Sequence, residues 1–558
     1  MINIDKDLSS IQEARTLAAQ ARKAQEVMST FSQAQLDEIV ARIARVAASH
    51  AQEWAKNAVE ETGYGNVADK VTKNLFASEF VYDFIKDMAT VGIINEDHKK
   101  KTVDVGVPLG VIAALVPSTN PTSTAIYKTL IAIKAGNGIV FSPHPGARKC
   151  TQATIKVLKE AAEEAGAPTG IIACMETLTL QGTTELMQSP DVALILATGG
   201  AAMVKAAYSS GTPTISGGPG NAPAFIERSA DIKKSVKQII DSKTFDNGVI
   251  CASEQSIVVE KCIEDKVIEE LKLKGAYFLS DQESEKIAQL LVFPNGAINQ
   301  AVVGKKASEL AEKAGFSVPN TTSVLIAKEN SVSRDNPFSR EKLCPVLAFY
   351  SEKDWVAGCE RSLELLRNEG QGHTLVIHSQ NEDVIREFIL RKPVSRVLIN
   401  TPAALGGIGA STNISPALTL GCGAVGGGST SDNISPLNLI NIKKAAYGVR
   451  EIEDLSAGNS EQVSELNSEA SNINSYGLHT RASTDVGFDT RFIEAFREEK
   501  VDTRFSAPHP LSNEPDTRFC TANQALRICE SDPVQAVAND KAQQVERLLG
   551  EVIKRINV

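Results

Sequence analysis

Residues 110–143 read GVIAALVPSTNPTSTAIYKTLIAIKAGNGIVFSP, in which two short apolar runs stand on either side of a segment with helical periodicity. The first run leads into the polar loop PSTN, residues 117–120, and the helical segment ends at Gly136, where a helix C-cap is expected. A strand, a helix and a second strand form a βαβ unit, and such units build parallel sheets. Ligands of parallel sheets bind at the carboxyl ends of the strands, so the PSTN loop is a candidate binding position.

The same alternation continues to Gly218. After residue 143 the apolar runs are IIACMET and VALILAT, and the helical segments are ARKCTQATIKVLKEAAEEAG and LQGTTELMQ. A helical segment over residues 9–61 precedes the first run, and a second series of strands and helices extends over residues 224–412. The pattern predicts an α/β protein with a parallel sheet in the first of two domains.

The composition of the 558 residues excludes several classes of protein. Hydrophobic residues make up 42% and charged residues 23%, which is ordinary globular usage. A net charge of -10 does not favour binding of the chain as a whole to nucleic acid or to an anionic membrane. Neither a secretory leader nor an apolar run of about 18 residues is present, so we expect a cytoplasmic protein. The nine cysteines form no CxxC pair, which argues against a disulfide framework or a metal site.

The last 110 residues differ in composition from the rest. After Gly448 the sequence is rich in Ser, Asn and Glu, which is typical of a flexible, mostly disordered linker. The tetrapeptide DTRF occurs there three times, at residues 489–492, 502–505 and 516–519, either as a multivalent short motif or as a recent duplication. The terminal segment 534–558 places apolar residues on one helical face. Such an amphipathic helix docks on its own protein or binds a partner.

The window FDNGVICASE, residues 245–254, contains the candidate nucleophile Cys251. Most cysteines are buried and inert, so the assignment of Cys251 as a nucleophile depends on other motifs in the sequence. Asn120 lies in the loop after a predicted strand, where a side-chain amide can donate to a developing oxyanion. Gly199 and Gly200 form a turn between a strand and a helix, where backbone N–H groups can approach a pyrophosphate.

These motifs resemble those of the CoA-acylating branch of the aldehyde dehydrogenase superfamily. The resemblance covers roughly residues 9–448 and is closest to the propionaldehyde and acetaldehyde dehydrogenases of bacterial microcompartments. Five segments carry it in family order: FDNGVICASE, VPSTNPTSTAIYKTLIAIKAGNGIVFSPHP, SGGPGNAPAFIERSAD, EKLCPVL and TLGCGAVGGGSTSDNISP.

The resemblance implies an aldehyde dehydrogenase-like fold, with a Rossmann-type cofactor domain and a second α/β catalytic domain. Within the region that it covers, the predicted parts are residues 1–223 for the N-terminal helices and the NAD and CoA domain, 224–412 for the catalytic domain, and 413–448 for a return segment to the cofactor domain or for oligomerisation. Composition places the linker at residues 449–533. Periodicity, together with analogy to microcompartment enzymes, predicts an encapsulation helix at 534–558.

The resemblance also implies roles for single residues. Cys251 attacks the aldehyde, and Asn120 stabilises the oxyanion that forms. Glu341 holds the nicotinamide ribose. The positions expected to line the cofactor site are Val116, Pro117, Ser118, Ser142, His144, Thr198, Gly199, Gly200, Gly217, Gly218, Glu341 and Leu343. Ser142 and His144 stand where hydrolytic relatives carry a ribose-binding lysine, a departure that fits a site which must also admit CoA.

The segment TISGGPGNAP separates two possible reactions. Hydrolytic relatives carry a glutamate there that activates water, whereas this chain has glycine at position 217 or 218. Since a general base typically contributes about 100- to 10,000-fold, its absence favours attack by the CoA thiol in a ping-pong mechanism. The alternatives are a hydrolytic aldehyde dehydrogenase and an assembly protein with a vestigial core.

Three further sequence features are weaker evidence for a binding site. Gly421, Gly423 and Gly426 satisfy GxGxxG, but no helix is expected to open there. His144 is a loop histidine that reaches a ribose or a CoA phosphate, or is simply solvated. The role of His373 stays open.

The sequence therefore predicts an NAD-dependent, CoA-acylating dehydrogenase of a short aliphatic aldehyde, with propionaldehyde as the first candidate. The expected partners are a second copy of the chain, in a dimer or tetramer, and a microcompartment shell protein or cargo enzyme bound through residues 534–558. Neither a metal, nucleic acid nor a membrane is expected.

Overall fold

The computed structural model describes residues 5–293 and 295–452, and its first helices follow the apolar periodicity of the sequence. The helical segment predicted over residues 9–61 is confirmed as three helices. They are α1 (Lys6–Met28), α2 (Gln33–Ser49) and α3 (Ala51–Thr62). Ser32 and Gln35 form a capping box that starts α2. Next come α4 (Val67–Leu75), a π-helical turn (Phe76–Phe80) and α5 (Val81–Ile85).

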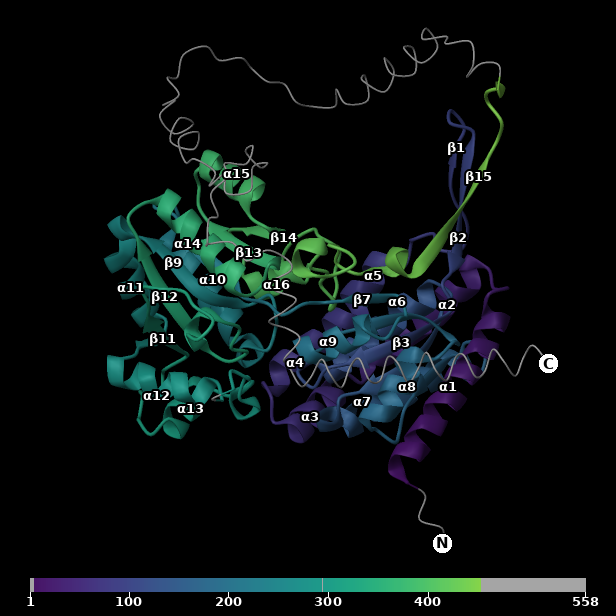
Figure 1. Ribbon diagram of the computed structural model, residues 1–558, viewed down its shortest axis with the longest axis horizontal. Coiled ribbons are helices and arrows are strands. Elements are labelled where there is room, and N and C mark those ends of the chain that lie inside the picture. The colour runs from purple at the N-terminus through teal and green to yellow at the C-terminus, as the bar shows by residue number, and fades with distance from the viewer. Residues whose placement is uncertain (1–4, 294, 453–558) are drawn as a thin grey trace, which may run out of the picture. The chain divides into compact units, whose positions relative to one another are not determined.

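A five-stranded parallel sheet follows, in the order β5-β4-β3-β6-β7 (Figure 1). Its strands are β3 (Val111–Val116), β4 (Gly138–Pro143), β5 (Ile172–Cys174), β6 (Val192–Ala197) and β7 (Thr214–Ser216). The helices that alternate with them are α6 (Pro121–Lys134), α7 (Arg148–Glu164), α8 (Leu180–Gln188) and α9 (Ala201–Tyr208). All four apolar runs predicted as strands form strands, and Gly136 follows α6 at φ +73° as expected for a helix end.

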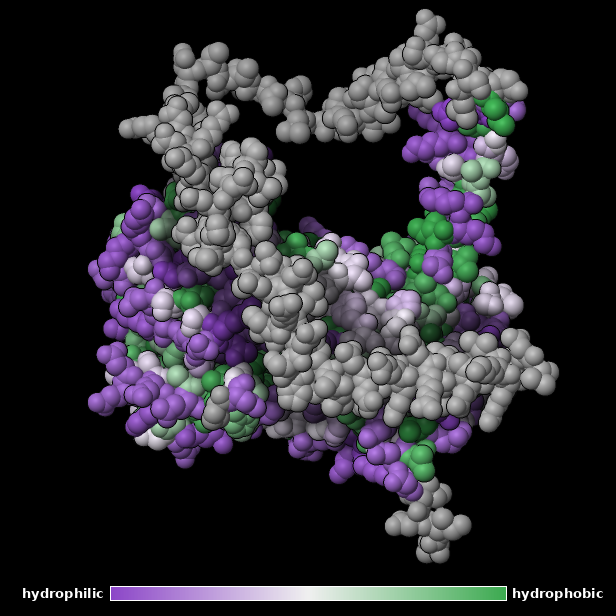
Figure 2. Space-filling model, viewed as in Figure 1, coloured by the Kyte–Doolittle hydropathy of each residue, from purple (hydrophilic) through white to green (hydrophobic). Residues whose placement is uncertain are grey.

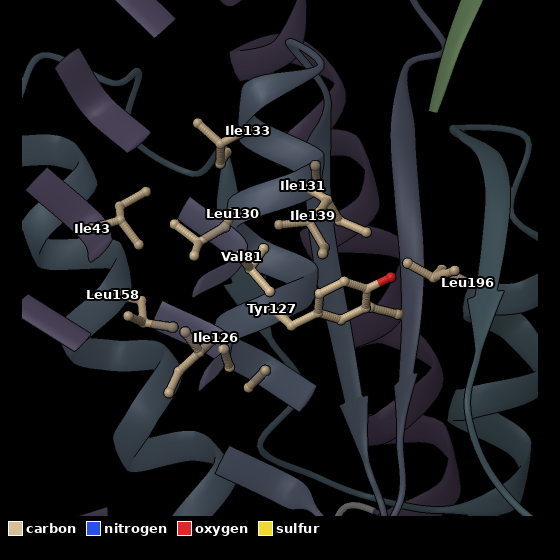
Figure 3. Packing of buried hydrophobic residues seen from close by; sticks show 14 of the residues in the cluster. Ile43, Val81, Ile126, Tyr127, Leu130, Ile131, Ile133, Ile139, Leu158 and Leu196 are labelled. Carbon is tan, nitrogen blue, oxygen red and sulfur yellow. The ribbon is translucent and has the colours of Figure 1, made fainter. Parts of the chain in front are cut away.

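Helix α6 lies at the centre of the first half. Each of its residues is buried, including Lys128 and Lys134, whose ammonium groups donate to the Leu115 and Lys86 carbonyls. Leu130 and Ile131 belong to the same buried cluster as Ile139 of β4 and Leu196 of β6, and Figure 3 shows Ile131 beside Ile139. The hydroxyl of Tyr127 donates to the Ile434 carbonyl at 2.6 Å, which ties this core to a segment 307 residues away.

A seven-stranded sheet forms the second half, in the order β10-β11-β12-β9-β8-β13-β14, and all of its pairs are parallel. The strands are β8 (Ala222–Ile226), β9 (Glu254–Glu260), β10 (Ala276–Phe278), β11 (Val324–Lys328), β12 (Val346–Glu352), β13 (Gly372–His378) and β14 (Val394–Ile399). Its helices are α10 (Ile232–Thr244), α11 (Glu264–Leu273), α12 (Asp281–Leu291), α13 (Ala307–Lys313), α14 (Trp355–Asn368), α15 (Glu382–Arg391) and α16 (Ala403–Gly407).

A three-stranded antiparallel sheet forms an arm that the sequence reading did not identify. The hairpin of β1 (Gly92–Asp97) and β2 (Thr102–Pro108) pairs with β15 (Ile440–Ala446), far along the chain. Figure 1 shows this sheet projecting from the helices around β3. Strand β15 lies at its edge, and every residue from Asn441 to Ala446 is exposed.

The link between the two large sheets positions the site. The chain leaves the carboxyl end of β7 at Ser216 and enters the amino end of β8 at Ala222. Five residues span at most about 18 Å, so the carboxyl edge of the first sheet adjoins the amino edge of the second. Loops from both edges therefore meet.

Some predictions lie outside the described residues, namely the linker, the DTRF repeats and the helix at 534–558. Within residues 5–293 and 295–452, no helix is long and apolar enough to cross a membrane. The same residues contain no group of three or more His, Cys, Asp or Glu side chains arranged to hold a metal ion.

The packing of α14 on β8 makes a test of the second half. A Cβ on Gly358 would lie 2.3 Å from the ring of Phe225, which stacks on Phe388 with centroids 5.0 Å apart. We expect Gly358→Ala to destabilise the protein by roughly 1–3 kcal/mol through overpacking, although Gly to Ala in an exposed helix gains about 1 kcal/mol. Urea unfolding followed by circular dichroism measures the change. Gly448→Ala is the control, because no atom lies within 4 Å of its added Cβ. A raised midpoint for Gly358→Ala would contradict this packing.

Candidate functional site

Cys251 lies in the short loop between the 3-10 turn Phe245–Gly248 and β9, at the amino edge of the second sheet. A Cβ on Gly220 would come within 1.7 Å of the Cys251 carbonyl oxygen, so only glycine allows the two loops to approach this closely. Lys243 Nζ donates to Gln255 Oε1 at 3.0 Å, which ties the end of α10 to the start of β9, the two elements on either side of this loop.

The Cys251 thiol is neutral in the free protein. Burial, the Glu341 carboxylate and the nearby Cys422 together raise its pKa to about 12, and the Arg396 guanidinium opposes the rise. Burial also raises the pKa of Glu341 to about 8, with Glu369 adding to the rise. The thiol must therefore lose its proton during the reaction, because the thiolate is the nucleophile.

Asn120 lies at the N-terminus of α6, immediately beyond the carboxyl end of β3. Its Nδ2 donates to the Val249 carbonyl at 3.2 Å, two residues before Cys251. Its Oδ1 accepts a 2.6 Å hydrogen bond from Lys73 Nζ. The structure thus brings the predicted oxyanion donor to the loop of the predicted nucleophile.

Glu341 and Leu343 precede β12 at the same amino edge. Glu341 Oε1 accepts a hydrogen bond from the Gly220 backbone N–H at 3.0 Å, and the Glu341 N–H donates to Glu369 Oε2 at 2.7 Å. Leu343 has φ +46°, a left-handed conformation that is unfavourable for leucine. Such strain concentrates at functional sites.

The glycine pair lies under the glycine-rich loop 421–431. Gly217 forms an antiparallel bridge with Gly421, and the Gly218 N–H donates to Cys422 Sγ at 3.3 Å. A Cβ on Gly218 would lie 2.9 Å from that sulfur. Cys422 therefore occupies the space into which a side chain at position 218 would extend. No α-helix starts within the described loop, so its GxGxxG pattern lacks the context of a dinucleotide fingerprint.

The candidate nucleotide residues gather at the carboxyl edge of the first sheet. Val116 ends β3, and Pro117 and Ser118 follow it. Thr198 and Gly199 follow β6, the strand beside β3, and Gly200 caps α9 without a side-chain hydrogen bond. The chain order of the strands reverses between β3 and β6, which is where doubly wound sheets bind ligands.

A cavity of about 390 Å³ lies against α9. Its lining includes Ala201, Tyr208, Gly218 and Cys422, so it extends from the helix to the glycine pair. A second cavity of about 740 Å³ lies on the other side of the glycine-rich loop and also includes Cys422. The two cavities provide room on both sides of that loop.

The remaining predicted residues, Ser142, His144 and His373, have hydrogen-bond partners of their own. Ser142 is buried, and its hydroxyl is shared with Thr183 at 2.8 Å. His144 is exposed, and its Nδ1 accepts the Gly146 N–H at 3.1 Å. His373 is buried at the start of β13, with Nδ1 2.9 Å from Thr374 Oγ1, and its Nε2 has no hydrogen-bond partner among the described residues. Burial and nearby Arg396 lower the pKa of His373 to about 3, so its ring is neutral.

Sequence reasoning missed several residues of the site. Lys70, Lys73 and Asp246 form a buried ion cluster beside Asn120, and Arg396 donates to the Gly421 carbonyl at 2.6 Å. The pair Asp246-Asn247 did contain a signal, since Asp and Asn before glycine favour left-handed backbone and both residues have positive φ. Nothing in the local sequence marks the lysines or the arginine.

Several known proteins are similar to this chain in sequence and in fold. The family model described as "Aldehyde dehydrogenase family" matches residues 7–283. A crystal structure of an acetylating aldehyde dehydrogenase from Geobacillus thermoglucosidasius has 48% sequence identity and a TM-score of 0.79, over 80% of this chain and 99% of that one. The chain belongs to the aldehyde dehydrogenase family. The α/β fold expected from the resemblance is therefore confirmed for the described residues.

Two further proteins are similar to this aldehyde dehydrogenase. The bifunctional aldehyde-alcohol dehydrogenase of Escherichia coli K12 is 44% identical over 444 residues, which are 79% of this chain and 50% of that protein. The chain thus spans about half the length of the curated relatives it matches first. Rhodopseudomonas palustris propionaldehyde dehydrogenase, solved with bound CoA and an acylated cysteine, is 26% identical with a TM-score of 0.71, over 78% of this chain and 97% of that one.

The electrostatics around Cys251 of this aldehyde dehydrogenase can be tested by alkylation. With a pKa near 12, the iodoacetamide rate constant of Cys251 should rise up to pH 10 without a plateau. Glu341→Gln should raise the rate above pH 8, because it removes a carboxylate that opposes the thiolate, and Arg396→Met should lower it. Peptide mass spectrometry follows each cysteine. Exposed Cys262 is the internal control, and its alkylation rate at each pH should be the same in the variants and in the unsubstituted protein. A plateau below pH 9 for Cys251 would show that the thiol is acidic instead.

Proposed function

We propose that this protein is a CoA-acylating aldehyde dehydrogenase, which oxidises a short aliphatic aldehyde with NAD+ and transfers the acyl group to CoA. The observation that carries the proposal is the pairing at one site of a cysteine, an oxyanion donor and a glycine pair. Cys251 and Asn120 supply the chemistry of a covalent acyl-enzyme, and Gly217 and Gly218 carry no base that would hydrolyse it.

The chain's own residues account for the first half of the reaction. The Cys251 thiolate attacks the aldehyde carbon, and negative charge moves to the aldehyde oxygen. The Asn120 amide lies beside the same loop and can donate to that oxygen, a contribution typically worth about 100- to 1,000-fold in rate. Loss of a hydride from the resulting thiohemiacetal leaves a thioester on Cys251.

The residues near α9 fit a dinucleotide. The first turn of α9 has no side-chain cap, and no atom lies within 4 Å of a Cβ added to Gly200, so the helix N-terminus is open to an anion. A nicotinamide cofactor held there would supply the two-electron acceptor for the hydride. Thr198, Gly199 and Gly200 would hold its pyrophosphate, and Glu341 would hold its ribose.

The acceptor of the acyl group in the second half of the reaction is inferred from the absence of a general base at positions 217 and 218. No carboxylate projects from positions 217 and 218, and Cys422 occupies the space beyond Gly218. Water attack on the thioester is then slow, so a thiol has time to bind. The cavities on both sides of the loop at residues 421–431 provide room for CoA. The R. palustris relative with CoA and an acylated cysteine supports this assignment.

Turnover with and without CoA tests the proposal. With propionaldehyde or acetaldehyde and NAD+, we expect sustained NADH production only when CoA is present, and a single turnover of bound enzyme when it is absent. Cys251→Ser should abolish both, because an alcohol in place of the thiol is a far weaker nucleophile. Absorbance at the NADH band measures the rate, and thioester formation is followed by mass.

Equal turnover without CoA would identify a hydrolytic aldehyde dehydrogenase. A Cys251→Ala protein that kept every cellular role would instead favour the assembly function. The comparison of the two aldehydes sets the preferred chain length.

We further propose that the chain self-associates through the edge strand β15. Edge strands carry unpaired backbone groups and are usually protected or paired. Ile442 is 52% exposed on this edge, Tyr447 and Val449 beyond it are 68% and 54% exposed, and Figure 2 shows green apolar surface along the arm. A second copy of the chain that adds a strand here would cover this surface.

Substitutions on the two edges of the arm test this. We expect Ile442→Asp on β15 to convert a dimer or larger assembly to the 59.6 kDa monomer, because a buried carboxylate would oppose the contact. Ile93→Asp on β1 is the matched control, since Ile93 is 66% exposed on the opposite edge of the same sheet. Light scattering after gel filtration gives the molar mass. Dissociation by the β1 variant alone would assign the interface to the other edge.

The terminal segment 534–558, outside the described residues, is proposed as an encapsulation helix that binds a microcompartment shell protein or cargo enzyme. Its support is the amphipathic periodicity of the sequence. Confinement suits the chemistry, because a reactive aldehyde would be held until it became a thioester.

A further inference from the structure

A cluster of buried charges lies directly beside the site and takes no part in the mechanism above. Lys70 and Lys73, three residues apart on α4, both face the Asp246 carboxylate, with Nζ to Oδ2 distances of 2.9 and 2.5 Å. The two lysine side chains are 3% and 2% exposed, and the Asp246 side chain is fully buried. Burial of charges is costly, so their retention calls for a reason.

Each lysine also reaches the loop that carries Asn120. Lys70 Nζ donates to the Thr119 carbonyl at 2.9 Å, and Lys73 Nζ donates to Asn120 Oδ1 at 2.6 Å. Asp246 belongs to the segment that leads to Cys251, and its left-handed backbone is fixed through Asp69, which accepts the Asp246 N–H at 2.7 Å. Helix α4 therefore connects the loop of the nucleophile to the loop of the oxyanion donor.

The chemistry of an ammonium group sets the orientation of the Asn120 amide. Lysine only donates hydrogen bonds, so Oδ1 of Asn120 must face Lys73 and Nδ2 must face Val249 and the Cys251 loop. In the flipped orientation, the amide would direct its N–H groups at a cation and its oxygen at a carbonyl. The positive charge on the oxygen side also withdraws electrons from the amide, which makes its N–H groups stronger donors.

The Lys73 charge is retained at neutral pH. Burial lowers the pKa of Lys73 to about 8, with Lys70 adding to the decrease and the carboxylates of Asp246 and Asp69 opposing it. The ring of Phe245, 5.5 Å from Nζ, covers the lysine on another side.

We propose that Lys73, held by Asp246 and Lys70, is a positioning residue that orients and polarises Asn120 toward the oxygen of the bound aldehyde. This inference rests on the proposed function, since it assigns how the oxyanion donor of that reaction is prepared.

Lys73→Met tests the proposal in the full chain. We expect kcat for NADH formation from propionaldehyde, NAD+ and CoA to fall roughly 10- to 100-fold with little change in KM, which is less than the loss of about 100- to 1,000-fold for removing the donor itself. Lys134→Met is the matched control, because Lys134 is also a fully buried lysine, paired with Asp37 at 2.5 Å on the far end of α6. Its kcat should stay unchanged.

A double-mutant cycle with Asn120→Ala separates positioning from a structural role. If Lys73 acts through Asn120, Lys73→Met lowers kcat in the unsubstituted protein and has no further effect in Asn120→Ala. The same fold loss in both backgrounds, or an unchanged kcat for Lys73→Met, would overturn the proposal.

Two measurements guard against a folding defect. The alkylation rate of Cys251 should be the same in Lys73→Met and in the unsubstituted protein, because the thiol loop stays in place. Lys70→Met, which leaves the Lys73–Asn120 hydrogen bond, should lose less activity than Lys73→Met; a larger loss would count against the assignment. Failure of the proposed function appears differently, as absence of NADH formation in the unsubstituted protein.

Discussion

The parallel direction of all strands in the two large sheets is the constraint on which the site depends. A parallel sheet places all its carboxyl ends at one edge and all its amino ends at the other. The five-residue link between β7 and β8 joins a carboxyl edge to an amino edge, so the loops after β3 and β6 face the loops before β8, β9, β12 and β13. Asn120 comes from the first set and Cys251 from the second. Neither sheet alone contains both.

Much of the fold could be predicted from the sequence, because its evidence is local. Alternating apolar runs and helical periodicity located β3, β4, β5 and β6, and a glycine marked the end of α6. Cys251 and Asn120 were found from motifs in the loops beside strands. The hairpin of β1 and β2 was missed, since β1 is largely exposed, β2 is mostly half-buried, and neither strand contains a continuous apolar run.

The rest of the site depends on contacts between distant residues. Lys73 meets Asp246 across 173 positions, and Arg396 meets the glycine-rich loop only because β14 lies at the sheet edge beside it. A lysine on a helix usually lies in solvent, so composition and spacing give no reason to bury it. The placement of second-sheet ligands at amino ends was also unforeseen. The rule for open parallel sheets concerns carboxyl ends, and here it describes only the first sheet.

The contact between Cys422 and the glycine pair bears on how such enzymes change their reaction during evolution. A carboxylate introduced at position 218 would need the space of the Cys422 sulfur, and one at position 217 would meet the Leu420 backbone oxygen 3.3 Å from its Cβ. The 2.9 Å contact at position 218 requires the Cys422 side chain to move, whereas the 3.3 Å contact at position 217 requires a smaller adjustment. A water-activating carboxylate at position 218 therefore needs a compensating change in the 420–422 segment, so more than one substitution separates thiol acceptance from hydrolysis by that route.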